Sequence, residues 1–211
     1  MRVLPLVFLF FCVTGCNNPS STTPVSESTS ATPPSVDLGR VLDTTVGGIP
    51  LERKALLDGR LSMLLPKSFT LMGEEMLRLK YPSERRPTVV YTNEAGSVNI
   101  GINFTTNPLQ QGELKELQEA MDTMFHNMYP SATWFESDTK SVNGREWLIL
   151  DFRGPAMDTE IRNIMMGISS EGRALFVSFN AVKSLEETWL EPAKAMLQSL
   201  TLEDPSPADE H

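Results

Sequence analysis

Few side chains in this sequence have the types and spacing that catalysis requires. His126 is the only histidine before the last residue, and it follows Asp122 by four positions in a stretch expected to be helical. A hydrolytic triad needs a nucleophile beside such a base, but the run at 167–171 (Gly-Ile-Ser-Ser-Glu) lacks the second glycine of Gly-x-Ser-x-Gly. We interpret His126 as an ordinary helix histidine, and we expect the protein not to be an enzyme.

Paired carboxylates could support acid–base chemistry, and Asp151 could pair with Asp158 or Glu160. A salt bridge from Asp151 to Arg153 or Arg162 is the simpler interpretation of these charges. The sequence also lacks the spacings of HExxH, Cys-x-x-Cys, EF-hand and glycine-rich phosphate motifs. It therefore predicts no metal site and no cofactor.

The charge balance bears on possible partners. The 211 residues include 18 Lys and Arg against 27 Asp and Glu, which gives a net charge of −9. No run of basic residues is present, and binding to phosphate backbones needs clustered Lys and Arg. We therefore expect no nucleic-acid partner. Two cysteines and two histidines are also too few for a Cys/His zinc site, and two cysteines are too few for a disulfide scaffold.

Cys16 is the residue with the clearest chemical meaning. It follows Arg2 and an apolar run at 3–13, which is too short to span a bilayer but fits the hydrophobic stretch of a signal peptide. The ending Val13-Thr14-Gly15-Cys16 resembles the lipobox of bacterial lipoproteins. The resemblance implies that residues 1–15 are removed, that the Cys16 thiol carries diacylglycerol, and that its amino group is often acylated. The alternative is an ordinary signal peptide with an incidental cysteine.

The residues after Cys16 indicate where the protein is anchored. Asn17, rather than aspartate, follows the cysteine, and by resemblance to known sorting rules this favours the outer membrane, facing the periplasm. Residues 17–36 contain ten Ser or Thr and four Pro. Such a composition buries too little apolar surface to offset chain ordering. We expect 16–36 to be a lipidated, disordered tether, with an acidic tail at 203–211.

The hydrophobic patterns predict which elements hold the remaining residues. Residues 37–57 are interpreted as a lead-in, because Gly47-Gly48 and Pro50 interrupt any long element, and the folded domain is expected at 58–202. Alternating apolar residues and turn signals such as Asn143-Gly144 predict antiparallel strands. The strands are expected at 61–65, 88–92, 98–104, 134–142, 145–153, 160–169 and 173–182.

Two longer helices are expected between and after these strands. The first has an apolar stripe rich in methionine, formed by Leu114, Leu117, Met121, Met124 and Met128. We expect this stripe to pack on the sheet, although methionine-rich surfaces also bind ligands. The second is expected to open with a capping box at 184–187, with Pro192 kinking it or lying in its first turn. Strands without βαβ alternation predict an α+β protein whose antiparallel β-sheet has helices packed on its faces.

This order of elements is similar to that of a known superfamily. The opening GRLSMLLPKSF, the hairpin–helix–meander–helix order and the closing W-x6-M-L-Q-S-L resemble the DcrB-like branch of the Mog1/PsbP superfamily. The resemblance covers about 58–202 and implies an α/β/α sandwich with adaptor, chaperone or accessory roles. It transfers no catalytic residue. The effector chaperones of that branch lack signal peptides, so this sequence departs from them.

One surface could contact a partner. On the strand at 145–153, Trp147, Asp151 and Arg153 lie opposite Leu148, Leu150 and Phe152. An aromatic side chain beside charges is typical of an interaction patch if that face is open. If helices cover both faces, Trp147 belongs to the core instead.

Together these patterns favour a membrane-anchored bacterial envelope lipoprotein, non-enzymatic, whose tethered domain binds a protein partner in an accessory, adaptor or immunity-type role. The alternative is a small-ligand carrier with a pocket between the sheet and the methionine-rich helix.

Overall fold

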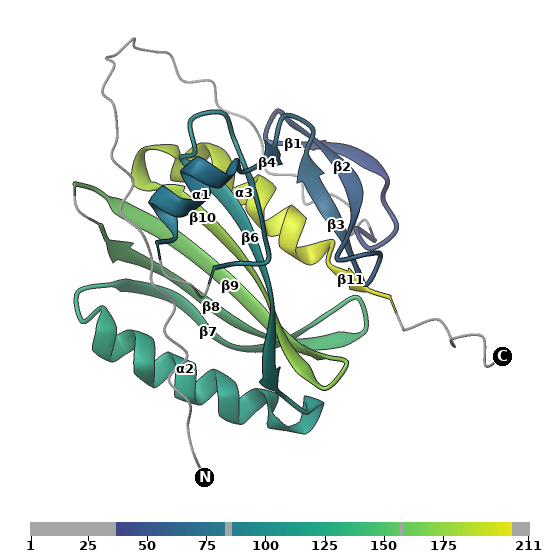
Figure 1. Ribbon diagram of the computed structural model, residues 1–211, viewed down its shortest axis with the longest axis vertical. Helices are drawn as coiled ribbons and strands as arrows, with labels where there is room; N and C mark the ends of the chain where they lie inside the picture. The colour runs from purple at the N-terminus through teal and green to yellow at the C-terminus, as the bar shows by residue number, and fades with distance from the viewer. Residues whose placement is uncertain (1–36, 83–85, 157, 204–211) are drawn as a thin grey trace, which may run out of the picture.

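The computed structural model describes residues 37–82, 86–156 and 158–203 (Figure 1). The predicted signal peptide, Cys16, the tether and residues 204–211 lie outside the described residues. The elements in chain order are β1 (Asp43–Val46), β2 (Ile49–Leu56), β3 (Leu61–Pro66), β4 (Thr70–Leu71), α1 (Glu74–Lys80), β5 (Val89–Thr92), β6 (Val98–Pro108), a 3-10 turn η1 (Gln111–Glu113), α2 (Leu114–Met128), β7 (Thr133–Val142), β8 (Arg145–Pro155), β9 (Glu160–Ser170), β10 (Arg173–Val182), α3 (Lys183–Gln198) and β11 (Thr201–Leu202).

A seven-stranded sheet forms the centre of the molecule. Its strand order is β4-β5-β6-β10-β9-β8-β7, and each neighbouring pair is antiparallel. The β7–β8 hairpin turns at Asn143 and Gly144, which both have positive φ, as the predicted Asn-Gly turn requires. The predicted α+β class with an antiparallel sheet is therefore confirmed.

The segment predicted as a lead-in is part of the folded structure. Its strands β1 and β2 join β3 and β11 in a second, four-stranded sheet of order β1-β2-β3-β11. Gly47 and Gly48, with positive φ, form the turn between β1 and β2 rather than ending the structure. Leu51 is fully buried and Leu56 is 5% exposed, so both belong to the core. The expected boundary at residue 58 was wrong, because this short hairpin is stabilised by distant parts of the chain.

The larger core lies on the α3 face of the seven-stranded sheet. Helix α3 contacts β9 and β10 as well as β3, so it joins the two sheets (Figure 1). The predicted apolar faces of β6 and β10 point into this core, together with Trp189, Met196 and Leu200 of the helix. Trp189 packs on Phe69 with ring centroids 5.1 Å apart. Burying such aliphatic and aromatic surface is the main favourable contribution to folding.

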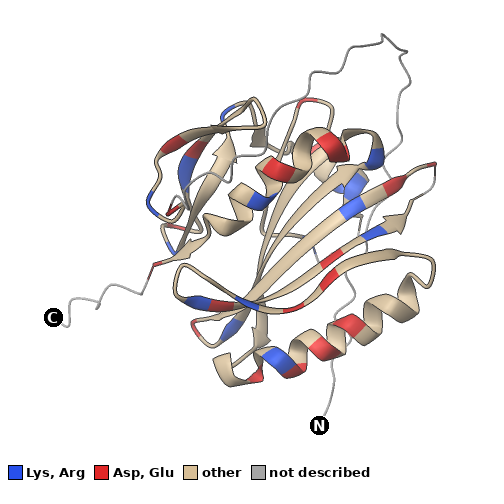
Figure 2. Cartoon of the chain, turned by 180° about the vertical axis from the view of Figure 1, so that it is seen from behind, with Lys and Arg blue, Asp and Glu red and all other residues tan. Residues whose placement is uncertain are grey.

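Helix α2 packs on the opposite face of the sheet, over β7 and β8. Leu114, Met121 and Phe125 are buried against Leu148, Leu150 and Phe152 of β8. The predicted packing of the methionine-rich stripe on the sheet is confirmed for most of its length, although Met128 at the helix end is 41% exposed. The outer side of α2 is acidic, with exposed Glu116 and Glu119 (Figure 2).

The start of α3 differs from the prediction. Strand β10 runs directly into the helix, and Val182, with ψ of 148°, is the N-cap residue without a side-chain cap. Ser184 is therefore inside the helix, and the expected capping box does not form. Pro192 also lies inside α3. Glu186, which belonged to the expected box, lies in the first turn and instead binds arginines of the sheet.

Candidate interaction site

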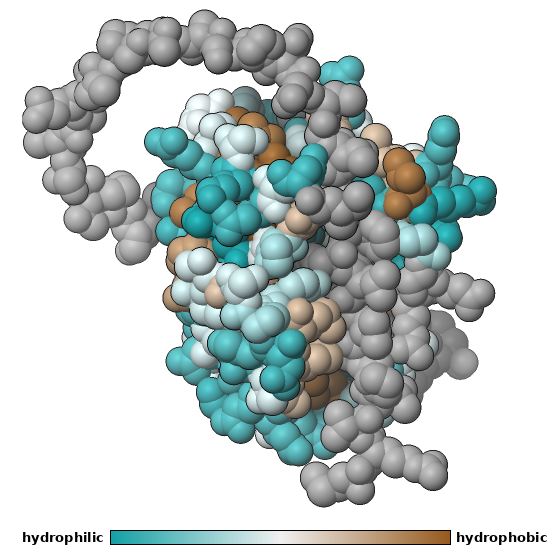
Figure 3. Space-filling model, turned by 90° about the vertical axis from the view of Figure 1, so that its left-hand side faces the viewer, coloured by the Kyte–Doolittle hydropathy of each residue, from teal (hydrophilic) through white to brown (hydrophobic). Residues whose placement is uncertain are grey.

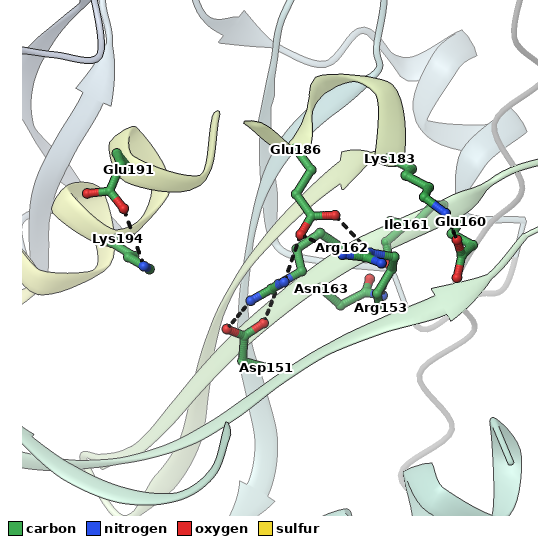
Figure 4. A network of polar contacts seen from close by, with 10 residues as sticks. All are labelled: Asp151, Arg153, Glu160, Ile161, Arg162, Asn163, Lys183, Glu186, Glu191 and Lys194. Carbon is green, nitrogen blue, oxygen red and sulfur yellow. Dashed lines mark hydrogen bonds and ion pairs between the residues drawn. The ribbon is translucent and has the colours of Figure 1, made fainter. Parts of the chain in front are cut away.

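A network of charged side chains connects the first turn of α3 to the central sheet (Figure 4). Arg162 on β9 binds Asp151 on β8 through two hydrogen bonds, Nε to Oδ1 at 2.6 Å and Nη2 to Oδ2 at 2.7 Å. Its Nη1 donates to Glu186 Oε1 at 2.8 Å. Arg153 donates to the same carboxylate, from Nε at 2.8 Å and from Nη2 at 3.1 Å. Two guanidinium groups and two carboxylates thus balance each other in charge.

Burial and ion pairing shift the pKa values of Asp151 and Glu186 in opposite directions. Burial raises the pKa of Asp151, and the hydrogen bonds and charge of Arg162 only partly oppose this effect. Burial also acts to raise the pKa of Glu186, but the hydrogen bonds and charges of Arg153 and Arg162 outweigh it and the pKa is lowered. Arg162 has only 5% of its side chain exposed, so loss of one partner would leave a buried charge unpaired.

The side chain of Phe135 covers the guanidinium of Arg162. A β-bulge interrupts the β7–β8 register between Trp134 and Glu136, and Phe135 is the extra residue. The Arg162 Cζ atom lies 3.4 Å from the centroid of the Phe135 ring, which is the geometry of a cation–π contact. Phe135 itself is 45% exposed. The buried arginine thus holds an exposed aromatic ring in place.

Further aromatic rings lie beside this residue on the other face of the sheet. Trp134 stacks on His126 of α2, with centroids 4.0 Å apart and an interplanar angle of 7°. It also packs on Phe152 at 4.8 Å, and Phe152 contacts Tyr129 at 5.8 Å. The neighbours Trp134 and Phe135 therefore lie against opposite faces of the edge strand β7. We refer to His126, Met128, Tyr129, Trp134 and Phe135 as the aromatic end.

The predicted patch of Trp147, Asp151 and Arg153 does not form an open surface. Trp147 is fully buried in the α3-face core and Asp151 is 6% exposed, because the neighbouring elements cover this face of β8. Arg153 keeps 23% of its side chain exposed and is paired with Glu186. The alternative considered for Trp147, a core position, is the correct one. The predicted salt bridge of Asp151 is confirmed with Arg162, but Asp158 and Glu160 do not join it.

The remaining predicted positions have structural partners. His126 lies 3.3 Å from the Asp122 carboxylate, and its Nδ1 is 3.0 Å from the Asp122 carbonyl. Ser169 Oγ donates to the Leu109 carbonyl at 2.6 Å. The space between α2 and the sheet, where a ligand pocket was considered, is occupied by buried side chains that include Phe125 and Phe176. Among the described residues, no cluster of three His, Cys, Asp or Glu side chains could hold a metal ion.

A second arginine fixes the first described residues to the other end of α3. Arg53 on β2 donates from Nε to the Val41 carbonyl at 2.9 Å and from Nη2 to the Leu38 carbonyl. Its Nη1 donates to Ser62 Oγ at 3.1 Å and to the Ser199 carbonyl at 3.2 Å. Burial lowers the pKa of Arg53, and nearby carboxylates oppose the effect. This cluster, the Arg53 clasp, attaches the segment that follows the predicted tether.

The sequence alone could not locate the aromatic end. Phe135 breaks the alternation of β7 because it lies in a bulge, and Trp134 and His126 come from separate elements. The relevant signal is the aromatic pair Trp134-Phe135 at the beginning of a strand. The predicted patch was placed on the next strand instead and did not include this pair. No helix in the described residues is both long and apolar enough to cross a membrane.

Known proteins resemble this chain in structure, and none matches it in sequence. No protein-family profile matches the sequence, and no curated protein matches it. CyanoP, the cyanobacterial PsbP of Synechocystis sp. PCC 6803, superposes with a TM-score of 0.54 at 11% identity, over 72% of this chain and 92% of CyanoP. The chain has a PsbP-like fold. LpqN of Mycobacterium tuberculosis, described as involved in cell envelope biogenesis, has a TM-score of 0.50 at 11% identity, over 77% of this chain and 99% of LpqN.

The PsbP-like fold fits the predicted Mog1/PsbP-like architecture of a sheet with helices on both faces. At 11% identity the two similar structures establish the fold, and they transfer no site residue to this chain.

Proposed function

We propose that the protein is a bacterial envelope lipoprotein, anchored through Cys16, whose folded domain binds a protein partner and catalyses no reaction. The observation that carries this proposal is the sequence Val13-Thr14-Gly15-Cys16 after a short apolar run. Acyl chains contribute about 0.8 kcal/mol per buried CH₂, and two or more chains anchor a protein stably. The same reasoning, with Asn17 after the cysteine, favours the outer membrane and a domain that faces the periplasm.

The arrangement of the folded part supports a tethered domain. The Ser/Thr/Pro-rich stretch ends at residue 36, and the Arg53 clasp holds the chain from Leu38 onward. A flexible stretch of about 20 residues spans roughly 25 Å on average. Such a tether gives the domain access to partners near the membrane surface without fixing its orientation. A DcrB-like accessory or adaptor role, on a fold that LpqN also has, is part of this proposal.

The chemistry of the described residues favours binding over catalysis. The most buried charged groups, Asp151 and Arg162, bind each other through two hydrogen bonds. The exposed side chains of Phe135 on β7 and Met128 on α2, in contrast, have the composition of protein interfaces. The partner role is therefore the function that this surface supports best.

Metabolic labelling with an alkyne fatty acid tests the anchor. We expect the wild-type protein to incorporate the label and Cys16→Ser to lose it, with the unlabelled domain appearing in the soluble periplasmic fraction. Cys12→Ser is the matched control, because Cys12 lies within the segment that cleavage removes, and it should be labelled like the wild type. A wild-type protein without label, or equal labelling of both variants, would show that Cys16 is not the lipidation site. Separation of inner and outer membranes on a density gradient then tests the outer-membrane location.

A further inference from the structure

The aromatic end exposes apolar side chains at the edge of the central sheet. Five large hydrophobic residues of the described chain are markedly exposed, and two of them, Met128 at 41% and Phe135 at 45%, lie on either side of the short α2–β7 connection. Figure 3 views this side of the molecule, where brown and tan apolar atoms lie among teal hydrophilic ones. Exposed aromatic and methionine side chains beside arginine are enriched at the centres of protein interfaces.

These rings are packed against neighbouring side chains of the same domain. One face of the Phe135 ring lies on Arg162, whose guanidinium is fixed by Asp151 and Glu186. Trp134 is stacked between His126 and Phe152 on the other side of the strand. Side chains that are already ordered lose little conformational entropy on association, so their burial contributes more fully to affinity.

The aromatic end lies far from the point where the predicted tether joins the domain. Glu186, in the first turn of α3, belongs to the network beneath Phe135, whereas Ser199, after the last turn, belongs to the Arg53 clasp. Ser199 follows Glu186 by 13 positions, which corresponds to about 20 Å of helix. In Figure 1 α3 runs from the upper left of the molecule to the four-stranded sheet beside β11. The aromatic end and the Arg53 clasp are thus separate surfaces of the domain.

The free charges around the aromatic end are acidic. Arg153 and Arg162 are neutralised by Glu186 and Asp151. Exposed Glu187 directly follows Glu186 in α3 and makes no ion pair with another described residue, and α2 adds the exposed Glu119, seven positions before His126. A partner with complementary charge would therefore present Lys or Arg beside apolar side chains.

We propose that the aromatic end is the docking surface of the domain, and that it takes a basic protein segment whose apolar side chains bury Phe135 and Trp134. This inference rests on the proposed partner-binding function and specifies where and by what chemistry the partner binds.

Site-specific photocrosslinking in intact cells tests the surface. The full-length chain would carry p-benzoylphenylalanine in place of Phe135, or in place of Leu42 or Leu79 as controls that are 73% and 72% exposed elsewhere. We expect a discrete protein adduct from position 135, at least tenfold stronger than from either control, with the crosslinked peptide of the partner carrying Lys or Arg. Substitution Glu187→Lys should reduce this adduct several-fold, whereas Glu191→Lys, at a more distant exposed position of α3, should not.

The other possible crosslinking results would each contradict a different part of the proposal. An adduct from position 42 or 79 but not from 135 would overturn the docking surface and leave partner binding intact. Absence of protein adducts from all three positions would contradict partner binding itself, and lipid label on Cys16 would still be tested separately. An adduct that persists in Glu187→Lys, or whose crosslinked peptide is acidic, would overturn the basic character of the partner. Melting temperatures of the variants within a few degrees of the wild type would confirm that they fold.

Discussion

Two arginines near opposite ends of α3 perform different tasks with the same chemical group. Arg53, near the C-terminal end, donates to the backbone carbonyls of Leu38, Val41 and Ser199. Arg162, near the N-terminal end, donates to the carboxylates of Asp151 and Glu186 and lies against the ring of Phe135. The first joins segments of the chain, and the second positions side chains on the surface.

The difference shows how its hydrogen-bond partners determine the role of an arginine side chain. Carbonyl acceptors belong to the backbone, so Arg53 immobilises chain segments whatever their side chains are. Carboxylates bind a guanidinium more strongly than neutral acceptors do, and their bidentate geometry fixes the plane on which Phe135 stacks. We expect loss of Arg162 to affect the whole domain, and loss of Arg53 to affect mainly the attachment of residues 38–41.

The largest effect is expected from Arg162→Met. The substitution keeps an apolar stem but leaves two carboxylates in a buried setting without this partner, which costs about 3–5 kcal/mol in the free energy of unfolding. Urea denaturation measures the loss. The double variant Arg162→Met with Asp151→Leu removes the buried charge and should recover a large part of that stability. A loss below about 1 kcal/mol for the single variant would show that the network is not a major source of stability.

A smaller and more local effect is expected from Arg53→Met. The substitution leaves the carbonyls of half-buried Leu38 and Val41 and of buried Ser199 without this donor, so we expect a loss of about 1–3 kcal/mol. Hydrogen exchange should increase at residues 38–42, and trypsin should cleave faster after Arg40. Arg60→Met, which removes a half-exposed arginine bound to Glu171 at 2.8 Å, is the control and should leave residues 38–42 protected. Uniform acceleration of exchange throughout the domain would contradict a local role for Arg53.

The smallest effect concerns the pH dependence of stability. The pKa of Glu186 is lowered below its ordinary 4.5 in the folded state, so its stabilising contribution is present above that pH and is lost as pH falls through the folded value. Glu186→Gln should therefore destabilise the domain more at pH 7 than at pH 3. The pKa of Asp151 is raised above its ordinary 3.8 in the folded state. Its contribution to the free energy of unfolding therefore falls as pH rises through the folded value.

Urea titrations of Glu186→Gln and Asp151→Asn across this pH range should consequently diverge from the wild type in opposite directions. If stability depends on pH in the same way in both variants and in the wild type, the pKa values of Glu186 and Asp151 are not shifted as the network implies. Glu191→Gln, on an exposed turn of α3, is the control for a carboxylate outside the network and should follow the wild-type pH profile.

Local patterns predicted most of the regular elements. Alternation in β6 and β10 correctly predicted which side chains enter the core, and the Asn143-Gly144 turn was predicted from two residues. These elements follow from the local sequence because side-chain alternation and turn conformation are properties of a few neighbouring residues. The PsbP-like fold then follows from their order.

The features that the sequence did not predict depend on distant contacts. Trp147 is buried because α3 and the smaller sheet cover its face of β8, and the chain places both far from it in sequence. Phe135 is exposed over Arg162 because a bulge shifts the register of β7, and bulges have no strong local signature. The hairpin at 43–56 is ordered because its partners lie near residue 200 as well as in β3. The aromatic end is formed by such long-range contacts, and the predicted patch on β8 therefore did not include its residues.

The four-stranded sheet has a consequence for how the chain matures. Its strands β2 and β3 come from the beginning of the domain, and β11, which pairs Thr201 with Ser62, comes from the end. Strand β3 thus pairs with residues that are synthesised about 140 positions later. In a chain that crosses a membrane from its N-terminus, this sheet closes only after nearly the whole chain has emerged. A chain halted a few residues before Leu202 leaves that sheet incomplete and its hydrophobic side chains accessible to chaperones and proteases.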